Sequence, residues 1–316
     1  MTKGCKGGIL TLSEYKKEGN CMLQDLSFGK LENEFHNREP SCCDLVICIN
    51  GGRVLIKRDE MDALTLPNFS AAQKWSADYG WTRWNNESFR YIFRMQDVDF
   101  YLWMGQSGSC DDPDYQYEEV RLLRQLQSKE ICFALMTAWH LYAWYRDSRF
   151  CGRCAAPTVH DTAERMMRCP ACGNMIFPKI SPAVIVAVTD GDRILLSKYA
   201  GRQYTRYALL AGYTEIGETL EETVQREVME EVGLRVKNIR YYKSQPWGID
   251  GNVLMGFYCD LDGDDTINMD TTELSFAQWF DRHEIPARDD GISLTREMIR
   301  VFEAGCEPRE TNDLSN

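Results

Sequence analysis

The sequence predicts an α+β fold with an N-terminal β-rich domain, a small cysteine-rich module and a C-terminal α/β/α sandwich with a mixed sheet. Three observations carry this prediction. Apolar runs divided by glycine turns mark strands early in the chain, two Cys-x-x-Cys pairs lie mid-chain, and a capped amphipathic helix lies between apolar strands later. We expect an N-terminal arm over residues 1–38, the β-rich domain with a helical connector over 39–147, the cysteine module over 148–180 and the sandwich over 181–310.

The composition limits the classes of function. The 316 residues carry a net charge of −12, so we expect no polybasic surface for nucleic acid or membranes, although one end of a strand could still enter an active site. The chain begins without an apolar run of signal-peptide length, and no later stretch is long enough to span a bilayer. The 13 cysteines, an odd number, favour reduced thiols and a metal site over disulfides. We therefore expect a cytoplasmic protein.

The β-rich domain begins near Asp44 with alternating apolar runs. The run DLVICIN, the turn Gly51-Gly52 and the run RVLIKR predict a hairpin. The runs RYIFRM and FYLWMG, on either side of QDVD, predict a second pair of strands. Apolar residues at helical spacing over 118–146 predict a helix that is broken near Ser128.

The two Cys-x-x-Cys pairs are Cys151 with Cys154 and Cys169 with Cys172, and fourteen residues separate them. Each pair can supply two of the four ligands of a tetrahedrally coordinated ion, so the spacing predicts a zinc ribbon with one Zn²⁺ ion. Four protein ligands leave no open coordination position, and we therefore expect this zinc to be structural. Unrelated thiols or a redox pair are the alternatives, and neither requires two matched pairs.

The C-terminal domain shows apolar strands before and after a long polar helix. A turn at Asp190-Gly191 joins the first two strands into a hairpin. The predicted strands cover residues 183–188, 193–197, 239–244 and 253–261, and helices are predicted over 271–280 and 294–304.

The stretch from Gly212 to Leu234 carries the most specific pattern in the chain. Thr219 followed by Glu222 is a capping box that begins a helix, and Gly233 is suited to end it. An apolar stripe that must face a core recurs at every fourth position, at Leu220, Val224, Val228 and Val232.

Three carboxylates of this helix, Glu227, Glu230 and Glu231, share one face at the edge of the apolar stripe. Like charges at these spacings repel each other by roughly 0.2–0.5 kcal/mol per pair in water. A hard divalent cation such as Mg²⁺, which prefers oxygen ligands, would turn this repulsion into binding. An acidic helix face in solvent is the alternative, and the fixed spacing of the glycines, the arginine and the loop carboxylate favours the metal site.

The stretch resembles the Nudix box, G-x5-E-x7-R-E-U-x-E-E-x-G-U with U aliphatic, at every specified position. The matching residues are Gly212, Glu218, Arg226, Glu227, Val228, Glu230, Glu231, Gly233 and Leu234. The resemblance implies a Nudix hydrolase, which cleaves the pyrophosphate of a nucleoside diphosphate linked to another group.

The same resemblance implies which residues act in catalysis. Two or three Mg²⁺ or Mn²⁺ ions would be bound by Glu227, Glu231 and Glu273, by the main-chain carbonyl of Ala211, and by Glu230 directly or through water. Glu231 or Glu273 would take the proton of the attacking water. A further pair, the box arginine and the loop glutamate, would brace the loop against the helix.

Ser244-Gln245-Pro246-Trp247 lies ten residues after the box. Together with the zinc ribbon, this SQPW run resembles the NADH pyrophosphatase subfamily, with a close match from about Phe150 to Trp279. Members hydrolyse NAD(H) to AMP and nicotinamide mononucleotide, and some remove an NAD cap from the 5′ end of RNA. The subfamily usually continues PFPxS after SQPW, whereas this chain continues GIDGN. The two glycines make that segment more permissive, so the preference for NAD(H) stays open.

The resemblance also implies the substrate-binding positions, which are Gln245, Pro246, Trp247, Asn252, Phe177, Tyr213, Glu164 and Thr295. Phe177 and Tyr213 would stack on the nicotinamide ring, with one of the two rings supplied by the partner subunit of a homodimer. Ordinary packing is the alternative for Phe177 and for Trp247. The expected partners are NAD(H) and NAD-capped RNA.

Two other functions stay open. A pyrophosphatase for ADP-ribose or a dinucleoside polyphosphate is favoured by the changed segment after SQPW. A protein that only binds NAD, ADP-ribose or nucleic acid is the other, but such proteins typically lose Nudix glutamates, and all are present here. A turnover assay separates these functions.

Overall fold

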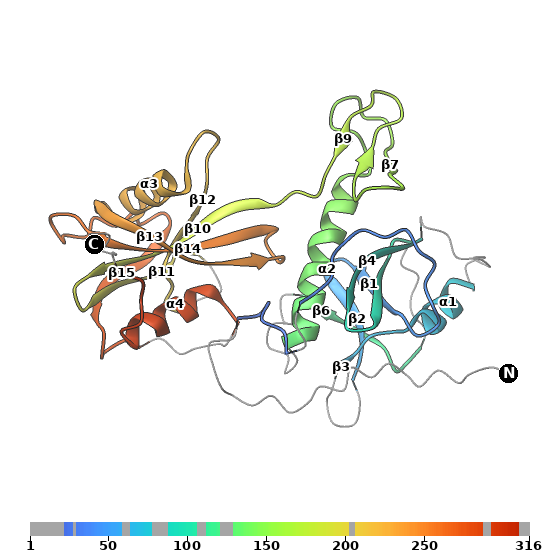
Figure 1. The fold of residues 1–316 in the computed structure, drawn as a ribbon, viewed down its shortest axis with the longest axis horizontal. Helices are drawn as coiled ribbons and strands as arrows, with labels where there is room; N and C mark the ends of the chain where they lie inside the picture. The colour runs from blue at the N-terminus through green and yellow to red at the C-terminus, as the bar shows by residue number, and fades with distance from the viewer. Residues whose placement is uncertain are drawn as a thin grey trace, which may run out of the picture. The chain divides into compact units, whose positions relative to one another are not determined.

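The computed structural model describes residues 22–27, 30–58, 64–77, 88–105, 112–120, 129–201, 206–286 and 292–309. The chain forms two compact units (Figure 1). The first unit extends from Gln24 to Lys179 and includes Gly248–Asp250, and the second contains residues 22–23, Ile180–Trp247 and the chain from Gly251 onward. The predicted arm over 1–38 lies largely outside the described residues. Within the described residues, no helix is long and apolar enough to cross a membrane.

The first unit contains a six-stranded sheet in its described part, with the order β3-β2-β1-β5-β4 and with β6 paired to β2. Its strands are β1 (Leu45–Asn50), β2 (Arg53–Arg58), β3 (Leu64–Thr65), β4 (Phe89–Met95), β5 (Val98–Trp103) and β6 (Gln116–Glu119). Gly51 and Gly52 have φ angles of 56° and 82°, which confirms the predicted two-glycine hairpin turn. The turn between β4 and β5 consists of Gln96 and Asp97, so it is shorter than the predicted QDVD segment.

Helix α2 (Lys129–Asp147) confirms the second half of the helix predicted over 118–146. The beginning of that prediction is wrong, because Glu118 and Glu119 lie in strand β6 and pair with Val54 and Arg53 of β2. The backbone hydrogen bonds of this pairing override a weak helical pattern. Residues 121–128 lie outside the described residues. A short helix that was not predicted, α1 (Phe69–Ala77), covers part of this sheet through Phe69 and Ala72.

The second unit contains a six-stranded mixed sheet in its described part, with the order β13-β14-β10-β11-β15 and with β12 paired to β10. Its strands are β10 (Ser181–Asp190), β11 (Arg193–Tyr199), β12 (Leu210–Tyr213), β13 (Val236–Trp247), β14 (Asn252–Leu261) and β15 (Leu274–Asp281). The β10–β14 pair is parallel and the other pairs are antiparallel, which confirms the predicted mixed sheet.

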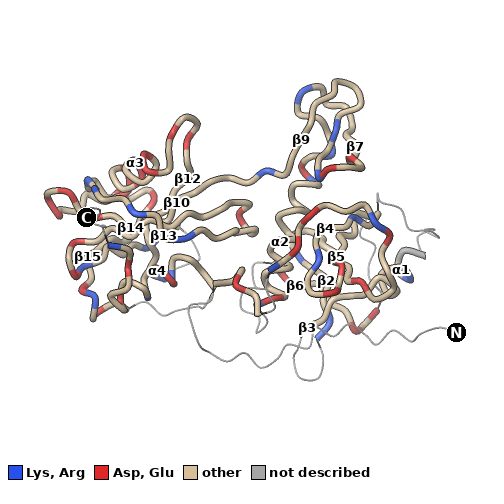
Figure 2. The backbone as a smooth tube through the Cα atoms, viewed as in Figure 1, with Lys and Arg blue, Asp and Glu red and all other residues tan. Residues whose placement is uncertain are grey.

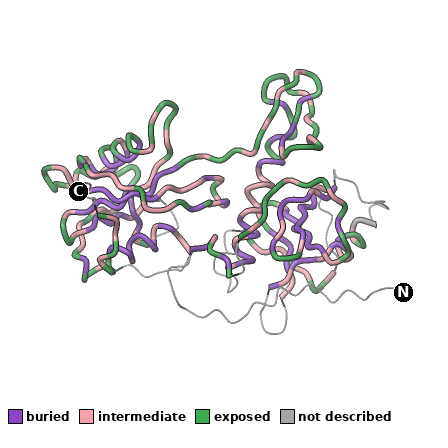
Figure 3. The backbone as a smooth tube through the Cα atoms, in the orientation of Figure 1, coloured by how far each residue is buried: buried purple, intermediate pink, exposed green. Residues whose placement is uncertain are grey.

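Two helices cover opposite faces of this sheet (Figure 1). Helix α3 (Leu220–Val232) packs on the face that presents Val184, Val186 and Val188, and helix α4 (Leu294–Glu303) packs on the face of Ile185 and Ala187. These residues of β10 alternate between the two faces, as a strand requires. The predicted α/β/α sandwich is therefore confirmed, and its core lies along β10 and β14 (Figure 3).

Residues 271–280 do not form the predicted helix, because Leu274–Asp281 is strand β15 at the edge of the sheet, paired with β11. Phe276 and Phe280 lie four positions apart in this segment. Two residues four positions apart share a face in a helix and also in a strand, so their spacing does not distinguish the two. Pairing with β11 decides in favour of the strand.

Candidate active site

Helix α3 begins and ends where the sequence predicts. The Thr219 side chain accepts the N–H of Glu222, the Glu222 side chain accepts the N–H of Thr219, and Gly233 ends the helix with a φ of 70°. Val224, Val228 and Val232 are fully buried. Each contributes about 1.5–3 kcal/mol through burial. The stripe therefore fixes the rotation of the helix and, with it, the direction of the carboxylates on the neighbouring face.

The Glu227 carboxylate lies against Gly212 of strand β12, where the absence of a side chain leaves room for it. A Cβ atom on Gly212 would lie 1.9 Å from the Glu227 carboxyl carbon, so any side chain at residue 212 would displace this carboxylate. Glu227 is buried, with 8% of its surface exposed. Burial raises the pKa of Glu227, and the charges of Glu230 and Glu273 raise it further, while Arg226 opposes them. A second positive charge beside Glu227, in addition to that of Arg226, would relieve the repulsion among these three carboxylates.

Arg226 joins the loop before α3 to the helix. Its guanidinium donates to Glu218 over 2.6 and 2.9 Å, and to the main-chain carbonyl of Tyr213 over 2.9 Å. It also donates to Glu227 over 2.8 Å and to Glu230 over 2.9 Å. The hydrogen bond from Arg226 to Glu218 is the largest cause that lowers the pKa of Glu218 to about 2. The predicted bracing of the loop by Arg226 and Glu218 is present, and the contacts with Glu227 and Glu230 are additional. Figure 2 shows acidic residues along α3 and the loop before it.

The side chain of Glu231 on α3 contacts the main chain of Ala211 on β12. Glu231 is 2% exposed, and its Oε1 accepts the N–H of Ala211 over 3.3 Å. The main-chain carbonyl of Glu231 accepts the N–H of Asp270, which holds the chain just before Glu273 against the end of α3. Glu230 differs from the other two helix carboxylates, because 60% of its side chain is exposed. The structure thus brings Glu227, Glu231 and Ala211 together.

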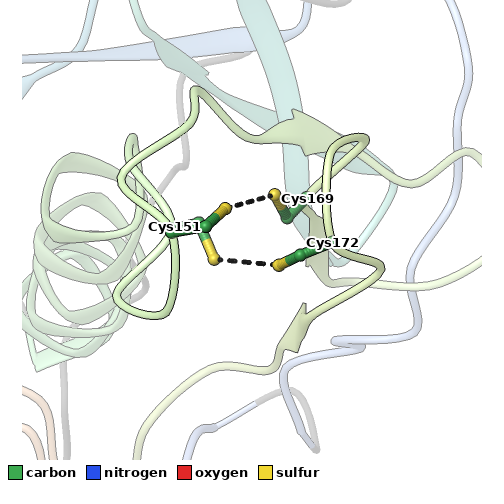
Figure 4. Close-up of side chains that lie close together, drawn as sticks. Cys151, Cys169 and Cys172 are labelled. Atoms are coloured by element: carbon green, nitrogen blue, oxygen red, sulfur yellow. Dashed lines mark hydrogen bonds between the residues drawn. The ribbon is translucent and has the colours of Figure 1, made fainter.

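The zinc ribbon consists of β7 (Val159–His160), β8 (Met167–Arg168) and β9 (Met175–Ile176), with the four cysteines in two loops. All four Sγ atoms lie within 4.8 Å of one another, and within the described chain they are the one group of three or more metal-ligating side chains this close together. Figure 4 labels three of them, Cys151, Cys169 and Cys172. The Arg153 N–H donates to Cys151 Sγ and is the main cause that lowers the pKa of this thiol to about 6. A lowered pKa favours the thiolate that zinc requires. For Cys154 the Ala156 backbone hydrogen bond lowers the pKa, but bonds with the Cys169 and Cys172 thiols and burial raise it overall.

The two cysteine loops have the same backbone design. In each loop the first cysteine carbonyl accepts the N–H of the residue four positions later, and these bonds join Cys151 to Ala155 and Cys169 to Gly173. Ala155 and Gly173 have φ angles of 61° and 71°. Two matched loops hold the thiols from opposite sides, which fits the tetrahedral geometry of a structural zinc ion.

The predicted substrate residues of the second unit differ in how far they are exposed to solvent. Tyr213 is 50% exposed, and its hydroxyl accepts a bond from the Asn252 side-chain amide over 3.3 Å. Trp247 is half-buried and pairs with Asn252 across β13 and β14, while Pro246 is exposed and Thr295 is half-buried in α4. The role of these residues in contacting the substrate stays a prediction.

Gln245 is fully buried, and its amide bonds to the chain at the beginning of α4. Its Nε2 donates to the Ile292 carbonyl and its Oε1 accepts the Leu294 N–H, both over 2.8 Å. In the first unit, Phe177 is 53% exposed and Glu164 is exposed in the loop between the cysteine pairs. The pocket assignments of these three residues also stay predictions.

Two family models match the chain. A NUDIX domain matches residues 179–302, and the NADH pyrophosphatase zinc ribbon domain matches residues 146–177. The chain is 34% identical to the NAD-capped RNA hydrolase NudC of Pectobacterium atrosepticum over 215 residues, which cover 67% of this chain and 81% of that protein. This chain is a Nudix hydrolase of the NADH pyrophosphatase family.

Other relatives of this Nudix hydrolase match a smaller part of it. The NAD-capped RNA hydrolase NudC of Pseudomonas putida is 39% identical over 167 residues, covering 52% of this chain and 60% of that protein. A solved structure of a NUDIX hydrolase from Nitrosomonas europaea covers 49% of this chain and 90% of its own, at 25% identity and a TM-score of 0.44.

Nudix hydrolases use Mg²⁺ or Mn²⁺, and the chemistry of the carboxylates on α3 suits such an ion. Glu227 and Glu231 are buried carboxylates on adjacent turns, and the glycine at 212 leaves the Glu227 carboxylate room beside β12. Carboxylate and carbonyl oxygens are the ligands these hard cations prefer. The sequence did not reveal the contacts of Arg226 with Glu227 and Glu230. The spacing of four positions between Arg226 and Glu230 is a usable signal for their pairing, whereas the spacing of one position between Arg226 and Glu227 is not.

Proposed function

We propose that this Nudix hydrolase cleaves the pyrophosphate of NAD(H) to AMP and nicotinamide mononucleotide, and that it also removes NAD caps from RNA. The observation that carries the proposal is the combination, in one chain, of the complete carboxylate helix, the four-cysteine ribbon and the SQPW run on β13. The relatives named NAD-capped RNA hydrolase support the second part.

We propose the following roles for the residues at α3. Glu227, Glu231, Glu273 and the Ala211 carbonyl bind the catalytic Mg²⁺ or Mn²⁺, with Glu230 assisting from the exposed side. When bound, the ions neutralise the diphosphate and activate the attacking water. Glu231 or Glu273 accepts the proton of that water. Arg226 holds the loop from Tyr213 to Glu218 in place, so that the carboxylates are ordered before substrate arrives.

In the substrate pocket, Tyr213, Trp247 and Asn252 contact the dinucleotide from the second unit. Their support is the Asn252–Tyr213 hydrogen bond and the half-exposed ring of Tyr213, which leave a stacking surface beside a polar group. Pro246 lies beside Trp247 on β13, and Thr295 lies on α4. We also propose Phe177 and Glu164 as substrate contacts, on the resemblance to the family alone.

Hydrolysis of ADP-ribose is the second candidate, because Gly248–Asp250 replaces the rigid segment usual after SQPW. A panel of NAD⁺, NADH, ADP-ribose, diadenosine tetraphosphate and NAD-capped RNA decides between the two. We expect the highest kcat/KM for NAD(H) and release of 5′-monophosphate RNA from the capped strand. The Glu231→Gln variant is the control for contaminating hydrolases. A kcat/KM for ADP-ribose above that for NAD(H) would redirect the assignment.

We also propose that the enzyme is a cytoplasmic homodimer. The half-exposed rings of Phe177 and Tyr213 support a site that is completed by a partner subunit, and a four-thiolate zinc site suits a reducing compartment. Light scattering should give twice the chain mass, and Phe177→Ala should raise the KM for NAD⁺ about tenfold through lost stacking. A monomeric mass at assay concentrations with full activity would contradict the dimer.

A further inference from the structure

A buried carboxylate on α4 has no role in the chemistry described above. Glu297 lies in the first turns of this helix and is 5% exposed. Its Oε1 accepts the Tyr242 hydroxyl over 2.7 Å and also the Lys243 ammonium. Its Oε2 is buried and has no hydrogen-bond partner among the described residues. A buried ion pair such as that of Glu297 with Lys243 is a weak source of stability, and fixing one geometry is the better attested role of such a pair.

The partners of Glu297 lie on the strand that carries the SQPW run. Tyr242 and Lys243 immediately precede Ser244 on β13. The Lys243 ammonium also lies 5.4 Å from the centre of the Tyr242 ring. That ring packs edge-on against Tyr258, whose hydroxyl donates to the Met298 carbonyl over 2.7 Å. Glu297 is thus bound to β13 by a charge and a hydroxyl, and the next residue of α4 is bound to β14.

Gln245 supplies a second connection between the same strand and helix. Its amide bonds the Ile292 carbonyl and the Leu294 N–H, so it satisfies a free backbone donor at the beginning of α4. Ser293, the N-cap residue, makes no side-chain cap hydrogen bond. The strand residue therefore does what a helix cap normally does.

The close approach of α4 to the sheet depends on Gly256. A Cβ atom there would lie 2.6 Å from Met298 Sδ and 3.3 Å from Leu294 Cδ2. Gly256 pairs with Lys243 across β13 and β14. The helix is therefore seated on the strand pair at Leu294 and Met298, with Glu297 and Gln245 fixing its position along the strand.

We infer that Glu297, acting through Lys243 and Tyr242 together with Gln245, is a positioning residue that sets where the first turn of α4 lies against the Ser244–Trp247 strand. This inference rests on the proposed function, because Thr295 in that turn and Trp247 on that strand are substrate contacts only under it. Of the proposed metal-binding carboxylates, Glu227, Glu230 and Glu231 lie on α3, on the other face of the sheet, and Glu273 lies just before β15. A shift of α4 therefore changes substrate binding and leaves the chemical step in place.

The test compares Glu297→Ala with Glu297→Gln, which keeps an acceptor for Tyr242 and Lys243. Glu303→Ala, at an exposed position in the last turn of α4, is the matched control. In Glu297→Ala we expect the KM for NAD⁺ to rise about tenfold with kcat within about twofold, since a displacement remote from the chemistry has effects of this size or larger. Hydrogen exchange at the amides of 292–295 should rise in the same variant. Glu297→Gln should restore most of both, and the control should match the wild type.

A wild-type KM and wild-type exchange in Glu297→Ala would overturn the inference, as would a fall in kcat at unchanged KM. If Glu297→Ala does not fold, Lys243→Met replaces it, because 38% of the Lys243 side chain is already exposed, and an unchanged KM there overturns the inference equally. Failure of the proposed function is distinct. A wild-type enzyme that cleaves no NAD(H) would remove that function, while the exchange comparison would still decide whether Glu297 positions α4.

Discussion

Glu231→Gln is expected to lower kcat for NAD⁺ by about 10²–10⁴-fold, the range typical of a lost catalytic acid–base group. The substitution removes one negative charge from the centre of the proposed metal site and removes a candidate base. It keeps the shape of the side chain and an oxygen that can accept the Ala211 N–H. Because Glu231 is 2% exposed, a neutral side chain costs no more to bury than the carboxylate. The midpoint of thermal unfolding should therefore not fall.

The matched control is Glu221→Gln, which neutralises an exposed carboxylate in the first turn of the same helix. Its kcat should equal that of the wild type. Mn²⁺ titration followed by electron paramagnetic resonance should show weaker metal binding in Glu231→Gln alone. A Glu231→Gln enzyme that keeps nearly full kcat would refute the metal-carboxylate account.

Replacing Cys169 by serine should unfold the zinc ribbon and leave the Nudix domain folded. Cys151 and Cys169 are buried in a module whose strands are only two residues long, so the ribbon has little other stabilisation. Structural zinc contributes about 10–16 kcal/mol in small zinc-binding peptides. The second unit has its own cores around α3 and α4 and does not depend on the ion. Metal analysis should give one zinc per wild-type chain, and limited proteolysis should cut the variant between residues 150 and 177.

Cys306→Ser, at an exposed thiol near the end of the described chain, is the control for general effects of losing a cysteine. It should retain one zinc and the wild-type proteolysis pattern. Far less than one zinc in the wild-type protein, or a Cys169→Ser ribbon that stays resistant to protease, would contradict the zinc assignment.

The parts of the fold that the sequence predicts correctly are those with local signals. Thr219, Glu222 and Gly233 act within one helix, and Gly51-Gly52 acts within one turn, so their effect does not depend on distant residues. The cysteine pairs are similar, because each loop closes on its own hydrogen bonds. These features fix α3, the first hairpin and the ribbon from sequence alone.

The wrong predictions concern segments whose secondary structure depends on residues that are distant in the sequence. Strands β6 and β15 are defined by pairing with β2 and β11, and nothing within their own residues specifies that pairing. The environment of Gln245 depends on α4, which lies about fifty positions later in the sequence. Resemblance points to Gln245 as a pocket residue, but only the structure shows its amide bonded to a helix. The Glu297 contacts are hidden from the sequence for the same reason.

The central claim is that the P–O–P bond of NAD⁺ is the bond that breaks, and product identification by liquid chromatography and mass spectrometry tests it most directly. Purified enzyme with Mg²⁺ or Mn²⁺ and NAD⁺ should yield AMP and nicotinamide mononucleotide in equal amounts. Nicotinamide with ADP-ribose would mean that the glycosidic bond is cleaved instead. No turnover by folded, zinc-loaded protein would mean that the carboxylate helix only binds its ligand, and either result would contradict the account.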